Sequence, residues 1–331
     1  MRCPHCQSEQ TVKNGSAIRS GQRQQRYKCR NCGKRFNERT GTPMARLRTA
    51  PELVAAAINV RSEGLGLRAT GRCFDKSHTT IMGWEQRLAE QHPHWSPPAP
   101  EEGEVTLEGD EIYTRVGENL PPSQCQGWTL TFIERKSRYW VAAHAGNKDE
   151  RLFTTGTEQT WQWAQAAEFI RWFTDGERRY GKALWTFASR FISKPSPHGT
   201  HYPWRKVWRE GLEVAMKIKG SQGQPRVEWV KVEHPFTAIS PADEVHANHN
   251  EAHNSALRRC CSAYRRRQNL YAKTVVGLQR VLEVQRLIYN WSRPHYSLGK
   301  KTTPAMAMGY CNRPISIYEI LTMRGFHDIT S

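Results

Sequence analysis

Four cysteines near the start of the chain have the spacing of a metal site. They form two Cys-x-x-Cys pairs, Cys3 with Cys6 and Cys29 with Cys32. Each pair can present two thiolates from one tight turn, and a structural Zn²⁺ takes four such ligands in a tetrahedron. A redox or disulfide pair is the alternative, but we expect no secretory signal or membrane span and therefore a reducing compartment. The pattern predicts a zinc ribbon over residues 1–42.

Three carboxylates lie where an α/β domain can bring them together. Asp110 and Asp175 each end a strand-like run, and Glu251 lies near the start of a predicted helix. Hard Mg²⁺ or Mn²⁺ ions take oxygen ligands, and two of them can hold the attacking and leaving oxygens of a phosphoryl transfer. Each residue alone could be a turn or surface residue, and Asp243 or Glu244 could take the place of Glu251. Their order along the chain predicts a metal-dependent phosphoryl-transfer site.

Basic residues are concentrated in two windows of the sequence. The chain has 49 Lys and Arg against 31 Asp and Glu, a net charge of +18. Residues 1–50 hold twelve basic and two acidic side chains, and residues 251–300 hold ten and two. These windows account for the whole excess, and concentrated positive charge is typical of proteins that bind a polyanion. We expect nucleic acid as the partner and no membrane association, because the first window predicts no basic amphipathic helix.

A small helical domain is predicted over residues 46–90. Its three short helical patterns begin at a capping box, Thr49 to Glu52, and the last two are separated by a sharp turn. This arrangement is typical of a helix-turn-helix domain, whose final helix enters the major groove of DNA. A helical bundle that only packs is the alternative. The residues of the final helix that would face DNA are Thr79, Thr80, Gly83, Gln86 and Arg87.

The largest domain is predicted over residues 104–299, after a proline-rich linker at 91–103. Three strand patterns between residues 105 and 143 predict an antiparallel beginning, and a helix, a further strand and a late helix follow. This order predicts a multidomain chain in which a zinc ribbon and an all-α domain precede an α/β ribonuclease-H-like catalytic domain with an insertion. Residues 300–331 are assigned to a C-terminal tail.

The separation of Asp175 and Glu251 indicates that the insertion lies at about residues 187–234. Tryptophans and basic residues alternate there, and they could stack on a frayed DNA end or form a small core of their own. Arg258 lies two helical turns after Glu251 on the same face, where it could contact a phosphate or form an ordinary salt bridge. The tryptophans of the segment are Trp204, Trp208 and Trp229.

Four stretches combine these motifs: Cys3 to Phe36, Gly109-Asp110-Glu111, Thr174-Asp175-Gly176 and Glu251-Ala252-His253-Asn254. In these stretches the chain resembles bacterial DDE transposases. Among them it is most similar to the insertion-sequence-one family, in which a zinc ribbon, a helix-turn-helix and a catalytic domain share one chain.

The resemblance implies a function for the whole chain. It would be a transposase that binds the terminal inverted repeats of an insertion element, cleaves their 3′ ends and transfers the strands into target DNA. Asp110, Asp175 and Glu251 would be the catalytic triad that holds Mg²⁺, and the four cysteines would hold zinc. A homodimer or a higher synaptic assembly is expected, in the bacterial cytoplasm and at the nucleoid. A DNA-binding regulator or a structure-selective nuclease derived from a transposase is the alternative.

Overall fold

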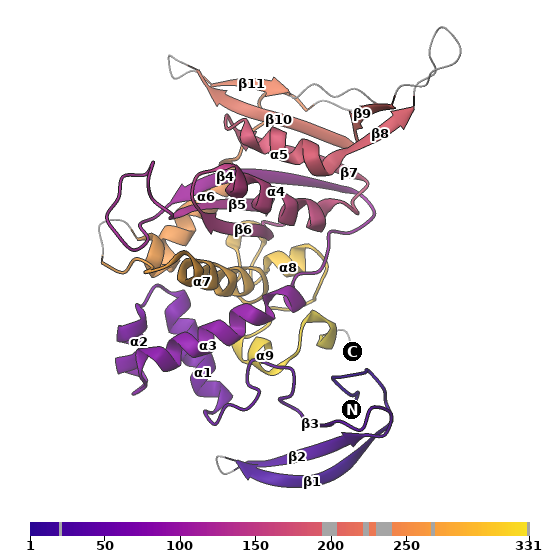
Figure 1. Cartoon of the computed structure of the whole chain (residues 1–331), viewed down its shortest axis with the longest axis vertical. Helices are drawn as coiled ribbons and strands as arrows, with labels where there is room; N and C mark the ends of the chain where they lie inside the picture. Colours follow the sequence, from indigo (N-terminus) through magenta and orange to yellow (C-terminus); the bar gives the residue numbers. More distant parts are fainter. Residues whose placement is uncertain (20–21, 194–203, 221–224, 230–239, 266–268, 330–331) are drawn as a thin grey trace.

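The N-terminal part of the chain is a small three-stranded antiparallel sheet at one end of the molecule (Figure 1). β1 (Thr11–Arg19) pairs with β2 (Gln22–Cys29), which also pairs with β3 (Arg35–Asn37). Tyr27 stacks on Phe36 with ring centroids 5.6 Å apart. So small an apolar cluster needs a cross-link, such as a metal ion or a disulfide, to stabilise the sheet. The computed structural model describes residues 1–19, 22–193, 204–220, 225–229, 240–265 and 269–329.

Three helices follow where the sequence predicts helical patterns. They are α1 (Pro51–Ser62), α2 (Leu67–Cys73) and α3 (His78–Gln91). The hydroxyl of Ser77 caps α3, because it accepts a hydrogen bond of 3.1 Å from the backbone N–H of Thr80. The inner faces of α1 and α3 carry buried residues at the spacing of an amphipathic helix. These residues are Val54, Ala57, Ile58, Ile81, Trp84 and Leu88.

The largest part of the chain is built on a mixed six-stranded sheet with the order β11-β10-β7-β4-β5-β6. β4, β5 and β6 are antiparallel, β7 and β10 run parallel to β4, and β11 is antiparallel to β10. Parallel strands need a crossover connection, which a helix between β6 and β7 provides. The strands are β4 (Glu104–Tyr113), β5 (Trp128–Glu134), β6 (Trp140–Gly146), β7 (Phe169–Asp175), β10 (Leu212–Lys219) and β11 (Pro225–Trp229).

Helices cover this sheet on both faces and at one edge (Figure 1). α4 (Glu150–Ala164) and α5 (Arg179–Ala188) pack together on one face, and α6 (Asn248–Cys260) lies on the other. α7 (Val275–Leu287) runs along the free edge of β6, where the Gln279 side chain bonds two backbone groups of that strand. The edge strand is therefore covered rather than open to pairing with another chain. None of the described helices is long and apolar enough to cross a membrane.

The C-terminal residues pack into the hydrophobic core that joins the α1–α3 part to the sheet. α8 (Pro304–Ala307) and α9 (Ile317–Thr322) are short, and α9 lies against α1. Trp95, from the proline-rich segment, packs edge-on against Trp291 with ring centroids 5.2 Å apart, and both side chains are fully buried. The segments expected as a linker and a tail thus contribute to the same core as the sheet.

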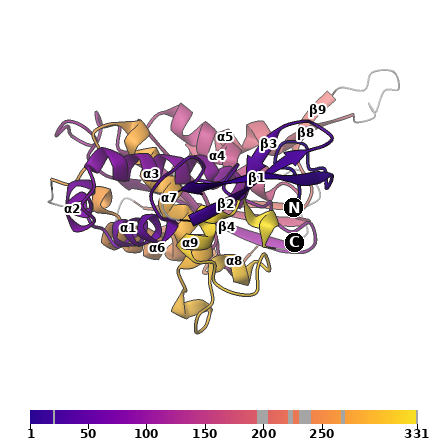
Figure 2. The same cartoon turned by 90° about the horizontal axis from the view of Figure 1, so that it is seen from below.

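Part of the segment expected as an insertion, residues 187–234, belongs to the central sheet, because β10 lies within it. β8 (Ser189–Ser193) and β9 (Trp204–Trp208) form a separate two-stranded ribbon that projects from the periphery of the molecule (Figures 1 and 2). Trp208 is buried against Trp185, with ring centroids 4.6 Å apart, whereas Trp204 is 72% exposed. The tryptophans of this segment divide between core packing and the exposed surface.

Candidate functional site

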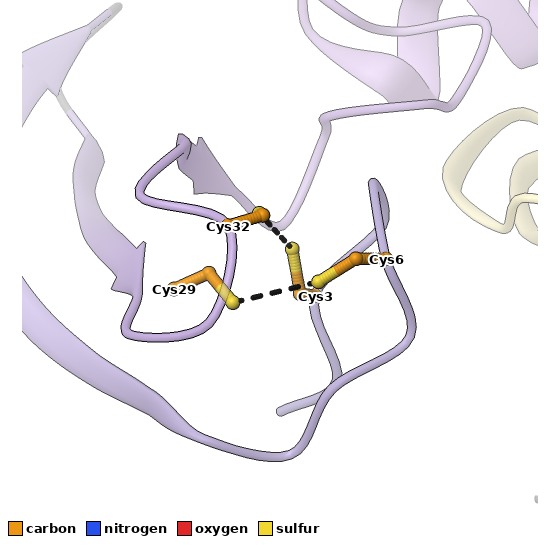
Figure 3. Close-up of side chains that lie close together, drawn as sticks. All are labelled: Cys3, Cys6, Cys29 and Cys32. Atoms are coloured by element: carbon orange, nitrogen blue, oxygen red, sulfur yellow. Dashed lines mark hydrogen bonds between the residues drawn. The ribbon is translucent and has the colours of Figure 1, made fainter.

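The two Cys-x-x-Cys turns face each other beside the N-terminal sheet (Figure 3). The Sγ atoms of Cys3 and Cys32 are 3.7 Å apart, those of Cys6 and Cys29 are 3.6 Å apart, and all four lie within 4.8 Å of one another. A tetrahedron of Zn–S bonds of about 2.3 Å has S···S edges of about 3.8 Å, whereas a disulfide bond is about 2.05 Å long. The four free thiols therefore fit a structural zinc ion.

Local contacts shape the turns that hold these thiols. The backbone N–H of Gly33 donates to the carbonyl of Cys29 over 3.0 Å, and the φ of +73° at Gly33 is one that glycine adopts most easily. The side-chain amide of Asn31 donates to Sγ of Cys6 over 4.0 Å, as groups around metal ligands commonly do. The cysteine site depends on the geometry of two short turns, and its residues can therefore be recognised from the sequence.

Two of the predicted carboxylates meet on adjacent strands beside the end of β7. Asp175 ends its strand as predicted, whereas β4 continues past Asp110 to Tyr113. β4 and β7 are parallel with Gly109 opposite Thr174, so Asp110 and Asp175 come next on each strand and lie side by side. The oxygens of Asp110, Asp175 and Glu111 can all be found within 4.8 Å of one another. Glu111 is absent from the sequence-based prediction. Its position directly after Asp110 could have indicated it as a site residue. Alternation along a strand, however, places the side chain of Glu111 on the opposite face of the sheet from that of Asp110.

Helix α6 carries the third predicted carboxylate to the same place. The side-chain amide of Asn254 donates a hydrogen bond of 2.8 Å to Oδ2 of Asp110. Glu251 lies three residues earlier and therefore on the same helix face. It is exposed, and it lines a cavity of about 280 Å³ together with Asp110 and Asp175. The structure thus places the three predicted carboxylates around one cavity.

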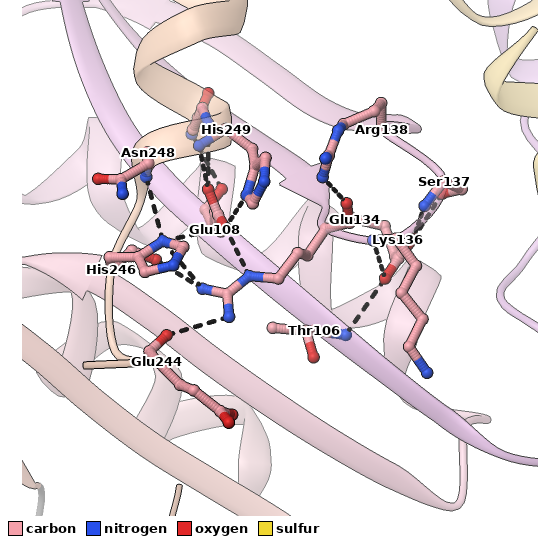
Figure 4. Close-up of polar contacts among 12 residues, drawn as sticks. Thr106, Glu108, Glu134, Lys136, Ser137, Arg138, Glu244, His246, Asn248 and His249 are labelled. Atoms are coloured by element: carbon pink, nitrogen blue, oxygen red, sulfur yellow. Dashed lines mark hydrogen bonds and ion pairs between the residues drawn. The ribbon is translucent and has the colours of Figure 1, made fainter. Parts of the chain in front are cut away.

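The other candidates for the third carboxylate lie elsewhere. Asp243 and Glu244 are exposed and are not among the residues that line this cavity. The carbonyl of Glu244 accepts a hydrogen bond of 3.0 Å from Arg135, while its carboxylate points away from the side chains around it (Figure 4). Arg258, farther along α6, is partly buried.

The clustered carboxylates repel one another, and burial separates them from most of the solvent that would screen their charges. Burial, followed by the charge of Asp175, raises the pKa of Asp110 to about 6. The same two causes raise the pKa of Glu111 to about 8, and burial raises the pKa of Asp175. A divalent cation would relieve this repulsion, because it favours the ionised form of each carboxylate that binds it. The cluster has the electrostatics of a metal-binding site.

Lysines border the carboxylates. Lys217 and Lys219 of β10 line the same cavity, and Lys217 is paired with Asp175 across the parallel strands. On the other face, Nζ of Lys148 lies 3.5 Å from Oε1 of Glu111 and 4.2 Å from the ring centroid of Trp128. These ammonium groups partly offset the negative charge of the carboxylates.

A buried glutamate farther back on β4 anchors the start of α6 (Figure 4). Oε2 of Glu108 accepts hydrogen bonds from the backbone N–H groups of His249 (2.9 Å) and Asn250 (3.1 Å). Its Oε1 lies 2.6 Å from Nε of Arg135 and 2.7 Å from Nδ1 of His249. Glu108, His246 and His249 could offer three metal ligands. The guanidinium of Arg135 already forms an ion pair with the Glu108 carboxylate, however, and its positive charge would repel a cation at this position. The cluster is a clamp that fixes α6 to the sheet.

The predicted DNA-facing residues of α3 differ in their surroundings. Thr79 and Gln86 are exposed. Thr80 is partly buried, and its hydroxyl lies 2.8 Å from the hydroxyl of the serine that caps the helix. The guanidinium of Arg87 donates to the carbonyl of Ala45 over 2.8 Å. Arg87 therefore ties α3 to the segment after the ribbon, whereas Thr79 and Gln86 lie on the surface.

No family model matches the chain. A relative of the chain comes from a transposable element. It is an uncharacterized protein in the transposable element ISH50 of Halobacterium salinarum, and it is 27% identical to this chain over 197 residues. The alignment covers 54% of this chain and 63% of the relative, so the chain spans less than two thirds of that protein. The chain is distantly similar to a transposon-encoded protein.

Proposed function

We propose that the chain is a DDE-type transposase with a ribonuclease-H-like catalytic part. The observation that carries the proposal is the meeting of Asp110, Asp175 and Glu251 around one cavity. Asp110 and Asp175 come from strands and Glu251 comes from a late helix, which are the kinds of element that the sequence patterns predict for them. Three antiparallel strands, a helix, a parallel strand and a late carboxylate-bearing helix follow one another in the expected order. The similarity to a protein of a transposable element supports the same conclusion.

Asp110, Asp175 and Glu251 offer the oxygen ligands that Mg²⁺ or Mn²⁺ requires, and these three residues would hold the ions. When bound, the ions supply an activated water or 3′-hydroxyl and stabilise the charge that develops on the phosphate. Asn254 keeps the carboxylate of Asp110 oriented through its 2.8 Å hydrogen bond. The two lysines of β10 would hold the neighbouring DNA phosphates.

The zinc ribbon and the α1–α3 part would bind the terminal inverted repeats of the element. Residues 1–50 hold twelve basic side chains against two acidic ones, and Thr79 and Gln86 lie on the exposed surface of α3. Affinity for DNA should fall steeply with salt, because phosphate contacts release counterions. Two copies of the chain would be needed to hold two ends together.

Strand transfer by the purified full chain tests the proposal. DNA with the ends of the protein's own element is incubated with Mg²⁺ and wild type, Asp175→Asn, Glu251→Gln or the control Glu244→Gln. Joined products from wild type and the control, but not from the other two, would support the proposed triad. Joined product from Glu251→Gln would contradict the role of that residue.

The same experiment separates the other two functions. Cleaved but unjoined DNA from wild type would favour a structure-selective nuclease, because cleavage needs the same carboxylates but no transfer. Specific end binding without cleavage or joining would favour a DNA-binding regulator.

A further inference from the structure

Glu111 is a buried carboxylate that the proposed triad does not use. In the pairing of β4 with β5 it stands opposite Leu130, and Leu130 packs against Gly156 of α4. Its neighbour Asp110 stands opposite Thr131, which bonds to residues of α6. The two consecutive carboxylates therefore start from opposite faces of the sheet, as alternation along a strand requires.

The end of β7 allows the two carboxylates to meet. β7 stops at Asp175, whereas β4 continues to Tyr113. Glu111 therefore has no strand residue beside it on that side, and its carboxylate can reach past the strand end toward Asp175. Its oxygen lies within 4.8 Å of oxygens of Asp110 and Asp175. Oxygens that bind one ion at about 2.0 to 2.6 Å can be no more than about 5 Å apart, so these three fit a shared cation.

One carboxylate oxygen of Glu111 has no hydrogen-bond donor among the described residues. Its side chain is 4% exposed, and among the described residues no hydrogen bond reaches Oε1. The ammonium of Lys148 lies 3.5 Å from that oxygen, in an ion pair without hydrogen-bond geometry. A buried carboxylate oxygen without a donor is costly. This oxygen without a hydrogen-bond donor is a second observation, in addition to the acidic cluster itself, that indicates a site for a cation.

A nearby carboxylate provides the contrast. Glu177 also faces this group of charges, but both of its oxygens are held by Arg179, at 2.9 Å and 2.6 Å. It is not among the residues whose oxygens come together. Glu177 is a satisfied ion-pair partner, whereas Glu111 is not satisfied.

We propose that Glu111 is a further ligand of the catalytic cation, reaching the ion from the face of the sheet opposite α6. The proposal rests on the proposed function, because it takes Asp110 and Asp175 as metal ligands. Lys148 partly neutralises the charge of Glu111, and its ammonium group lies 4.2 Å from the ring centroid of Trp128. When the cation binds, Lys148 is released from Glu111 and becomes free to contact a DNA phosphate.

Binding of Mn²⁺ to the zinc-loaded full chain, followed by electron paramagnetic resonance, tests the proposal without any activity measurement. The variants are Glu111→Gln, Asp110→Asn and the control Glu177→Gln, which removes a nearby charge but no ligand. Loss of a ligand should weaken Mn²⁺ binding at least about tenfold in Glu111→Gln. Loss of a screened charge should weaken it less than about threefold in the control. Asp110→Asn should bind least.

Equal, small effects in Glu111→Gln and the control would overturn the role of Glu111 and leave the triad untouched. Absence of Mn²⁺ binding by wild type would contradict the metal site itself, and with it the proposed function. Glu111→Asp, which keeps the charge on a side chain one methylene shorter, provides a second variant in case Glu111→Gln fails to fold. It should also bind Mn²⁺ more weakly than wild type, and wild-type affinity would overturn the proposal.

Discussion

The clamp between Glu108 and the start of α6 leads to a sharp prediction for the substitution Glu108→Gln. The carboxylate is fully buried and accepts hydrogen bonds from Arg135, from the ring and backbone of His249, and from the backbone of Asn250. A glutamine has nearly the same shape, so it leaves no cavity. When its single oxygen accepts from the two backbone groups, its NH₂ group faces Arg135 and the imidazole, where it cannot accept a hydrogen bond.

The size of the effect follows from the contacts that are lost. Glutamine weakens two charge-assisted hydrogen bonds, each worth about 1.5 to 3 kcal/mol, and leaves the buried guanidinium of Arg135 without its counter-ion. Arg135 keeps hydrogen bonds to the carbonyls of Glu244 and His246, which limits the loss. We expect the opening free energy of α6 to fall by about 3 kcal/mol, a factor of about one hundred in the opening equilibrium.

Hydrogen exchange of the peptide that contains α6 measures this opening directly. The matched control is Glu104→Gln on the same strand, because Glu104 is 32% exposed and its partner Arg171 is 22% exposed. An ion pair that solvent screens is worth about 1 kcal/mol or less, so the control should change exchange in α6 less than about fivefold. A similar small change in Glu108→Gln, or an equal increase in β1 and β2, would refute the clamp.

Three further predictions follow from the same structure. Cys29→Ser should remove zinc, unfold the ribbon and weaken DNA-end binding while sparing Mn²⁺ binding, as metal analysis and binding assays would show; unchanged zinc content would contradict the site. Burial lowers the pKa of His253 to about 3. Between pH 6.5 and pH 3 the imidazole is therefore protonated only in the unfolded chain, and the free energy of unfolding decreases as the pH is lowered. His253→Gln should therefore lose about 2 kcal/mol less than wild type in urea unfolding between pH 7 and pH 5. Gly109→Ala would place a Cβ 2.4 Å from the ring of Phe132, and it should lower the unfolding free energy by about 1 to 3 kcal/mol; wild-type stability would show that the ring can move.

Short-range patterns made several parts of the molecule predictable. The two Cys-x-x-Cys turns come together as their spacing indicates, and the three helices of residues 51–91 lie where their periodicity places them. The strand pattern that ends at Asp175 belongs to the same class, whereas the strand that holds Asp110 continues to Tyr113. Each of these features is decided by residues within a few positions of one another, because turns, caps and side-chain periodicity are local properties.

Contacts between distant segments decided the rest. Whether Glu111 reaches the carboxylate cluster depends on where β7 ends, and whether Glu108 is a surface residue or a buried clamp depends on α6 packing against β4. Trp95 lies in a segment whose prolines indicate a linker, yet Trp291 buries it. The sequence alone indicated the cysteines and three of the carboxylates that come together, and most of the local elements that hold them. The tertiary structure decided which of them share one site, because burial and electrostatic neighbourhood arise only when segments far apart in the chain pack together.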